Sequence, residues 1–338
     1  MDELKELIFR LCAAPGTPGD EDAAAKITAQ ELSKYAEVKI DQMGNVVAQM
    51  GKPDAKSHIM LDAHIDQIGL IVTNIDENGF IRIDRCGGVD RRVLPGSPVT
   101  IYGKELLTGI VCCTPPHLSD GSEDKVVAID KMVIDAGLTK AEADELIQPG
   151  DRILLNATPK SLIGNRITAA GLDDRAGVAS LIRCAQLLAK TELSCKLTIL
   201  CSSREEVGGQ GAVTGAYAVN PTQALVVDVS FAQQPGVAPE KCGKLGGGPM
   251  IGIAPPLNRP MADKLIAIAK QKNMPYKLDI MGSSTGTNSD EIAMTRAGVQ
   301  AVLISIPLRY MHTPVEVIDL TDVENTAQLM AEYIKGVE

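Results

Sequence analysis

The chain has 338 residues and a formal net charge of −10, with 45% hydrophobic residues, 3% aromatic residues and no tryptophan. This length predicts two domains, or one large domain with an insertion, and a core built from Ala, Val, Ile and Leu is typical of α/β proteins. An acidic surface repels phosphate backbones and no basic cluster is interleaved with aromatics, so we expect no nucleic-acid binding.

The hydropathy pattern argues against a membrane protein. No apolar run approaches the ~20 residues that span a bilayer, and the acidic amphipathic start lacks the basic residues of a signal peptide. We therefore expect a cytoplasmic protein without membrane contact. The 8 cysteines are scattered and form no Cys-x-x-Cys pair, which predicts buried free thiols.

The first predicted elements are two helices, at residues 2–14 and 20–35, because apolar side chains recur there at helical spacing on either side of a Pro- and Gly-rich turn. A hairpin around Gly44 follows. An interior strand over residues 58–61 then leads into His64.

From about residue 68 the pattern changes to short β-branched runs separated by turns, which predicts a small barrel or sandwich. One short helix is expected at residues 139–146, with Thr139 as its N-cap. A closing strand is expected at residues 152–155. Because this stretch interrupts an α/β chain and contains little that resembles a catalytic motif, we interpret residues 68–164 as an inserted β domain.

The α/β pattern then resumes and continues to the end of the chain. Strands are predicted at residues 196–201, 224–228 and 301–305, and helices at residues 174–190, 260–272, 288–296 and from Thr321. Apolar strands that end in polar residues and lead into helices predict a mainly parallel sheet flanked by helices. We assign residues 1–67 and 165–338 to this catalytic domain.

In such sheets ligands bind beyond the carboxyl ends of the strands. Five segments place carboxylates or imidazoles there: His64 and Asp66; Asp173 and Asp174; Glu205 and Glu206; Asp228; and His312. This much negative charge in one cleft is costly unless a cation compensates it. Mixed nitrogen and oxygen donors suit zinc, cobalt or manganese better than calcium or magnesium. Two such ions can activate water and polarise a carbonyl, which predicts a hydrolase.

Two residue pairs refine this prediction. His64 and Asp66 are two positions apart, so in a strand they would share a face and the carboxylate could orient the imidazole. Glu205 and Glu206 are neighbours that cannot easily reach the same point, so one could bind metal while the other acts as general base and then as acid. His58 and His117 lack motif partners, and we do not expect them to be ligands.

These motifs resemble, in order, those of the TET-type dinuclear-metal aminopeptidases, peptidase family M42, and the resemblance covers nearly the whole chain. The matching segments are residues 64–66, 171–177, 205–212, 227–228 and 309–314. The resemblance implies a phosphorylase/hydrolase-like α/β fold with an inserted PDZ-like β-barrel that serves dimerisation. It also implies peptide substrates and self-assembly, commonly into tetrahedral dodecamers built from dimers.

The same resemblance implies a ligand set for two divalent metal ions per subunit. Asp173 would bridge both ions, with His64 and Asp228 completing one site. Glu206 and His312 would complete the other.

The catalytic roles follow from the resemblance in the same way. Glu205 would be the general base, and Asp66 would orient His64. Either member of the Asp pair could be the bridging ligand; the alignment with the motif selects the first one over Asp174. Residues 284–290 resemble the family's substrate loop, but Asn288 stands where the family pattern has Asp.

The leading hypothesis is a metal-dependent aminopeptidase that releases N-terminal residues from short peptides. Two alternatives stay open: an endoglucanase-like glycosidase that works through two carboxylates, and a non-catalytic assembly module that keeps metal for stability. The sequence leaves undecided whether acidic or apolar N-terminal residues are preferred, which metal is native, and how many subunits assemble.

Overall fold

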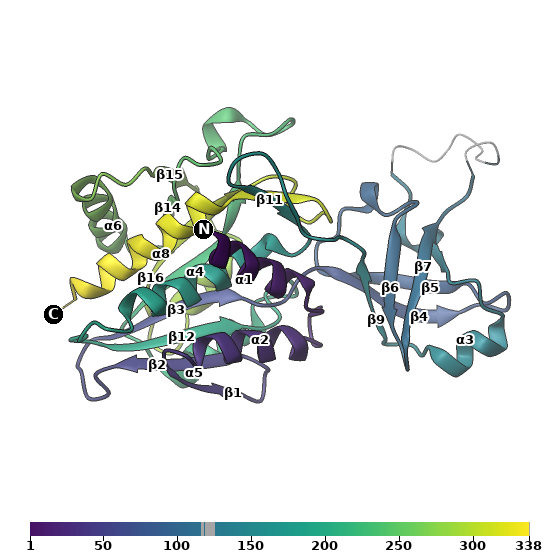
Figure 1. The fold of residues 1–338 in the computed structure, drawn as a ribbon, viewed down its shortest axis with the longest axis horizontal. Helices are drawn as coiled ribbons and strands as arrows, with labels where there is room; N and C mark the ends of the chain where they lie inside the picture. Colours follow the sequence, from purple (N-terminus) through teal and green to yellow (C-terminus); the bar gives the residue numbers. More distant parts are fainter. Residues whose placement is uncertain (116–117, 119–125, 338) are drawn as a thin grey trace.

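The computed structural model describes residues 1–115, 118 and 126–337, which form two lobes (Figure 1). The larger lobe is a sheet covered by helices, and the smaller lobe is a β-barrel. The chain builds part of the larger lobe first, then the barrel, and then returns to complete the larger lobe. The predicted α/β fold with an inserted barrel is therefore confirmed. His117 lies outside the described residues.

An eight-stranded sheet, counted over the described residues, has the order β1-β2-β12-β3-β13-β16-β14-β15. Its strands are β1 (Glu37–Ile40), β2 (Val46–Gly51), β3 (His58–His64), β12 (Lys196–Ser202), β13 (Gln223–Phe231), β14 (Met250–Ile253), β15 (Lys277–Ile280) and β16 (Gln300–Leu308). The four central strands β12, β3, β13 and β16 run parallel. Their carboxyl ends consequently meet at one edge of the sheet.

Helices cover both faces of this sheet because side chains alternate along the buried strands. Leu61 of β3 packs toward one face and its neighbour Met60 toward the other. The first face is covered by α1 (Asp2–Ala13), α2 (Asp22–Leu32), α4 (Leu172–Leu188), α6 (Arg259–Gln271) and α8 (Leu320–Lys335). The second face is covered by α5 (Gln210–Val219) and α7 (Asn288–Ala293).

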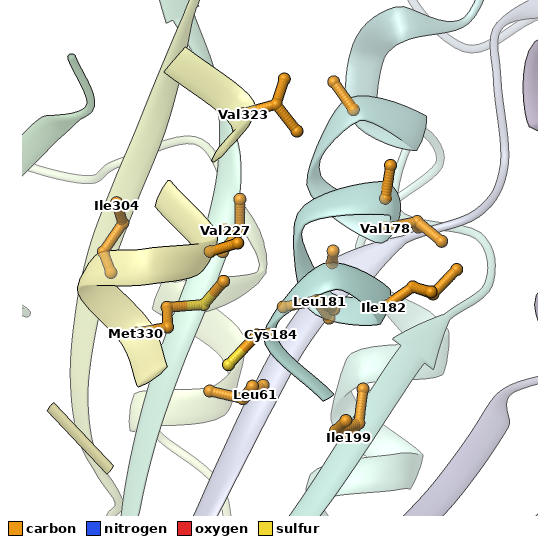
Figure 2. Close-up of a cluster of buried hydrophobic side chains, with 14 of the residues drawn as sticks. Leu61, Val178, Leu181, Ile182, Cys184, Ile199, Val227, Ile304, Val323 and Met330 are labelled. Carbon is orange, nitrogen blue, oxygen red and sulfur yellow. The ribbon is translucent and has the colours of Figure 1, made fainter. Parts of the chain in front are cut away.

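Figure 2 shows part of the larger of these two cores. Leu181 and Cys184 of α4 and Met330 of α8 point toward Leu61 of β3 and Val227 of β13. All five side chains are buried. This packing holds the central strands, and with them the positions of the residues at their carboxyl ends. None of the helices in the described ranges is long and apolar enough to cross a membrane.

The smaller lobe is a closed antiparallel barrel with the strand order β4-β5-β8-β7-β6-β9. Its strands are β4 (Gly69–Ile75), β5 (Ile81–Cys86), β6 (Pro98–Tyr102), β7 (Leu106–Cys112), β8 (Val133–Asp135) and β9 (Arg152–Leu155). It has a hydrophobic core of its own. Its helix α3 (Lys140–Leu146) begins with a capping box between Thr139 and Glu142. The predicted closing strand and N-cap are both present.

A small sheet joins the segment after the barrel to the C-terminal part of the chain, with the order β10-β11-β17. Its strands are β10 (Lys160–Ser161), β11 (Arg166–Ala169) and β17 (Glu316–Asp319). Three-residue 3₁₀ turns occur at Arg91–Val93, Ile129–Lys131 and Pro239–Lys241.

Several predicted boundaries were wrong. β13 does not end at Asp228 but continues to Phe231, because its pairing with β16 extends past the last residue that it pairs with β3. β3 ends at His64, so Asp66 is not in a strand. The helix predicted at residues 288–296 ends at Ala293. Helix α5 and strands β8, β10, β11, β14, β15 and β17 were not predicted.

Candidate active site

The carboxyl ends of the central strands surround a cavity of about 510 Å³. His64 reaches it from the end of β3, Asp228 from β13, and Glu205 and Glu206 from the turn after β12. Asp173 lines it from the first turn of α4, and His312 from the loop after β16. The structure thus brings these six sequence-predicted residues together at one site.

Within the cavity, two groups of three side chains have the spacing of metal ligands. His64, Asp173 and Asp228 form one group, and Asp173, Glu206 and His312 form the other, with the ligand atoms of each group within 4.8 Å of one another. Asp173 belongs to both groups, because its Oδ1 lies 3.1 Å from His64 Nε2 and its Oδ2 lies 3.3 Å from His312 Nε2. Asp174 belongs to neither group.

The other ring nitrogen, Nδ1, of each histidine contacts an oxygen atom of the protein. His64 Nδ1 lies 3.1 Å from the backbone oxygen of Asp66 and 3.4 Å from its carboxylate Oδ1. His312 Nδ1 lies 3.0 Å from the backbone oxygen of Gly88, which follows strand β5 of the barrel. A Cβ at position 88 would lie 2.6 Å from that nitrogen, so only glycine fits there. The barrel therefore takes part in orienting His312.

Asp66 makes a second contact that the sequence did not predict. Its Oδ1 accepts a hydrogen bond from the backbone N–H of Glu205 at 3.0 Å, and its Oδ2 accepts one from the N–H of Glu206 at 3.1 Å. The side chain is fully buried and does not line the cavity. Asp66 therefore positions both glutamates through their backbone, in addition to its contact with His64.

Replacing Asp66 by Asn should weaken this turn. The asparagine amide keeps one acceptor oxygen for one backbone N–H but presents its own NH₂ to the other. That buried N–H is left without an acceptor, which costs about 1–3 kcal/mol. We expect the free energy of unfolding, measured in urea, to fall by about that amount, together with turnover.

Asp322 provides a matched control, because it accepts hydrogen bonds from two backbone N–H groups, those of Gly246 and Gly248, away from the cavity. The Asp322→Asn variant should lose comparable stability and keep its turnover number. Equal turnover in the two variants would argue against the role of Asp66.

Glu316 of β17 is a site residue that sequence reasoning missed. Its fully buried carboxylate accepts the backbone N–H of Asp173 at 3.2 Å and that of His312 at 2.9 Å. The Glu316 side chain therefore connects the segment that carries Asp173 to the segment that carries His312. A glutamate between apolar residues of a short strand was the available sequence signal.

Electrostatics in the cavity are dominated by buried carboxyl groups. Burial raises the pKa of Glu205 to about 7, and burial together with the charge of Asp173 raises the pKa of Glu206 to about 8. Burial disfavours the charged form of His312, but its contact with Asp173 outweighs this and raises its pKa to about 10. For Asp173, contacts with both histidines outweigh burial and lower the pKa.

The donor set fits a pair of divalent cations. Each group offers one imidazole and two carboxylates, a combination that zinc and similar transition metals accept. Burial, and after it the charge of Asp228, raises the pKa of the neighbouring Asp174, whose Oδ2 has no hydrogen-bond partner among the described residues. The cavity thus concentrates carboxylates that cations would stabilise.

The loop that leads into α7, whose first residue is Asn288, forms one wall of the cavity through Thr285, Gly286 and Thr287. Asn288 itself points away, and its side-chain amide donates to Asp62 Oδ2 at 3.0 Å and to Ser202 Oγ at 2.9 Å. It anchors the loop to the sheet. His58 is also remote from the metal groups, since its Nε2 contacts Thr198 Oγ1 at 2.8 Å.

Comparison with known proteins assigns the chain to a family. Residues 44–329 match the family model described as M42 glutamyl aminopeptidase. Lysyl aminopeptidase of Pyrococcus furiosus is 32% identical over 98% of this chain and 97% of its own length.

Two solved peptidase structures are similar to this chain over nearly its whole length. A TET aminopeptidase from a marine sediment archaeon, Thaumarchaeota archaeon, superposes with a TM-score of 0.94 and 32% identity over 100% of this chain and 97% of that one. The TET1 peptidase of Pyrococcus horikoshii, which can assemble into a tetrahedron or a large octahedral shell, superposes with a TM-score of 0.87 and 30% identity, covering 99% of this chain and 100% of that one.

Proposed function

The chain belongs to the M42 glutamyl aminopeptidase family and is a hydrolase that acts on peptide bonds; on this premise we propose that it removes N-terminal residues from short peptides with the help of two divalent metal ions. The observation that carries the proposal is the pair of ligand groups that share Asp173. A carboxylate that belongs to both groups can hold two ions close together, as in a two-metal centre.

Asp173 would bridge the two ions. His64 and Asp228 would complete one site, and Glu206 and His312 the other, in agreement with the two groups described above. When bound, the metal pair supplies an activated water and polarises the scissile carbonyl. Zinc or cobalt suits these donors, and manganese is an alternative.

Glu205 is the proposed general base. It lines the cavity but belongs to neither ligand group, so its carboxylate is free to act on substrate or water. In this role a Glu205 carboxylate oxygen takes a proton from the attacking water and passes it to the departing amine. Asp66 and Glu316 hold the surrounding backbone, so the catalytic and ligand side chains are oriented before substrate binds.

Self-assembly is part of the proposal. The TET1 peptidase of Pyrococcus horikoshii can assemble into a tetrahedron or a large octahedral shell, and its structure matches 99% of this chain. We propose that residues 68–164 form the dimerisation domain, that residues 1–67 and 165–338 form the catalytic domain, and that dimers build a tetrahedral dodecamer which admits short peptides. A cytoplasmic location remains a prediction.

A panel of aminoacyl-p-nitroanilides, assayed after chelation and again after addition of zinc, cobalt or manganese, tests the proposal. Chelation should abolish hydrolysis and the added metal should restore it. Cleavage of cellulose oligomers that survives chelation would instead favour the glycosidase. Bound metal without hydrolysis of any aminoacyl substrate would favour the non-catalytic assembly module.

A further inference from the structure

We propose that the cavity selects peptides whose N-terminal residue has a cationic side chain, lysine or arginine, and that Glu291 is the counter-ion of that side chain. This inference rests on the proposed function and names its substrate class. It assigns Glu291 a role that is separate from the ligands and from the general base.

The charges that line the cavity are the first argument. Among the described residues that form its wall, none is Lys or Arg, while the carboxylates are Asp173, Glu205, Glu206, Asp228, Asp290 and Glu291. Two divalent ions would balance four of these six charges. The α-ammonium of the substrate would balance a fifth. One negative charge is left for a further cation, and an acidic side chain would only add to the repulsion.

The position of Glu291 identifies which carboxylate is available. Asp290 is already engaged, because its two oxygens accept the backbone N–H groups of Thr285 and Gly286. By contrast, no ion pair and no hydrogen bond from another described residue reaches the Glu291 carboxylate, which is only partly buried on α7. Its side chain lies against Gly209, where an added Cβ would come within 3.0 Å of its Cγ. Glu291 therefore presents a free negative charge in the cavity wall.

The same cavity offers apolar surface for an aliphatic stem. Val229 and Phe231 of β13 and Met311 line it, and Phe231 is 41% exposed. Lysine and arginine carry methylene groups that pack on such surface while the charged end reaches a carboxylate. The combination suits a long cationic side chain better than a short polar or acidic one.

Glu291 could instead bind the α-ammonium group that every aminopeptidase substrate carries. The two roles differ in a measurable way. A partner of the α-ammonium affects all substrates equally, whereas a side-chain counter-ion affects only lysyl and arginyl substrates.

The test compares kcat/KM for Lys-, Arg-, Leu- and Glu-p-nitroanilide in the metal-loaded wild-type protein and in the Glu291→Gln variant. The wild type should favour Lys and Arg over Glu. In the variant, kcat/KM should fall about tenfold or more for the Lys and Arg substrates. It should stay within about twofold of the wild-type value for the Leu substrate. Glu192→Gln, which removes an exposed charge outside the cavity, is the matched control and should change none of the ratios.

Three results would overturn the inference: a wild type that prefers the glutamyl substrate, an equal loss on all four substrates, and no loss on any. Activity on the leucyl substrate would show that the variant is folded and contains its metal ions. If the variant does not fold, the wild type still decides: both substrates carry the α-ammonium but only Lys has a second positive charge, so added salt should raise KM more for Lys than for Leu, and an equal rise for both would contradict the inference. A wild type that hydrolyses none of the four substrates would refute the proposed function itself, which is a distinguishable outcome.

Discussion

The Glu205→Gln variant should bind two metal ions per subunit and yet lose turnover by about 10²–10⁴-fold, the usual contribution of a general acid–base group. Glutamine has nearly the same shape as glutamate but cannot accept the proton. Because Glu205 lies outside both ligand groups, the substitution leaves the donors in place. Elemental analysis of the purified variant, together with steady-state kinetics on an aminoacyl-p-nitroanilide, measures both quantities.

The control for this experiment is again Glu192→Gln, which makes the same chemical change at an exposed position. It should keep both metal and turnover. Full activity in the Glu205→Gln variant would refute the assignment of the base. Loss of metal from that variant would instead mean that Glu205 is a ligand.

The Asp173→Asn variant should lose at least one of the two metal ions and nearly all activity. Asp173 is the one side chain shared by the two ligand groups found among the described residues, so its replacement weakens both. An amide also lacks the negative charge that offsets the two cations. Metal content per subunit, measured by elemental analysis after dialysis against a defined metal concentration, reports the loss directly.

The Asp322→Asn variant serves as a control here too, since it replaces another buried aspartate, remote from the cavity. It should retain both ions. Unchanged metal content in the Asp173→Asn variant would contradict the proposed ligand set.

Much of the fold could be predicted because local pattern and tertiary structure agree. The strand that ends at His64 is buried throughout and the strand that ends at Ser202 is buried after its first residue, so their hydrophobic runs are easily recognised. The barrel was predictable because its short β-branched strands differ from the α/β pattern on either side. Helix α5 was missed since it begins at the Gly208–Gly209 turn and is rich in small residues, which masks its periodicity.

The candidate site was also predictable only in part. Most of the predicted site residues could be proposed because they follow or lie in a recognisable strand, and Asp173 because it stands at the start of a long predicted helix. The contacts that hold them could not, because they depend on register between distant segments. Asp66 meets the N–H groups of Glu205 and Glu206 only because β3 and β12 run parallel with His64 opposite Ser202. Gly88 meets His312 only because the barrel lies beside the sheet lobe.

The most direct measurement is a metal titration of the chelator-treated protein, in which bound zinc or cobalt and hydrolysis of an aminoacyl-p-nitroanilide are followed together. The proposed two-metal centre predicts that the inactive metal-free protein gains activity as metal is added, until two ions are bound per subunit. Full aminopeptidase activity in protein shown to contain no metal would contradict it.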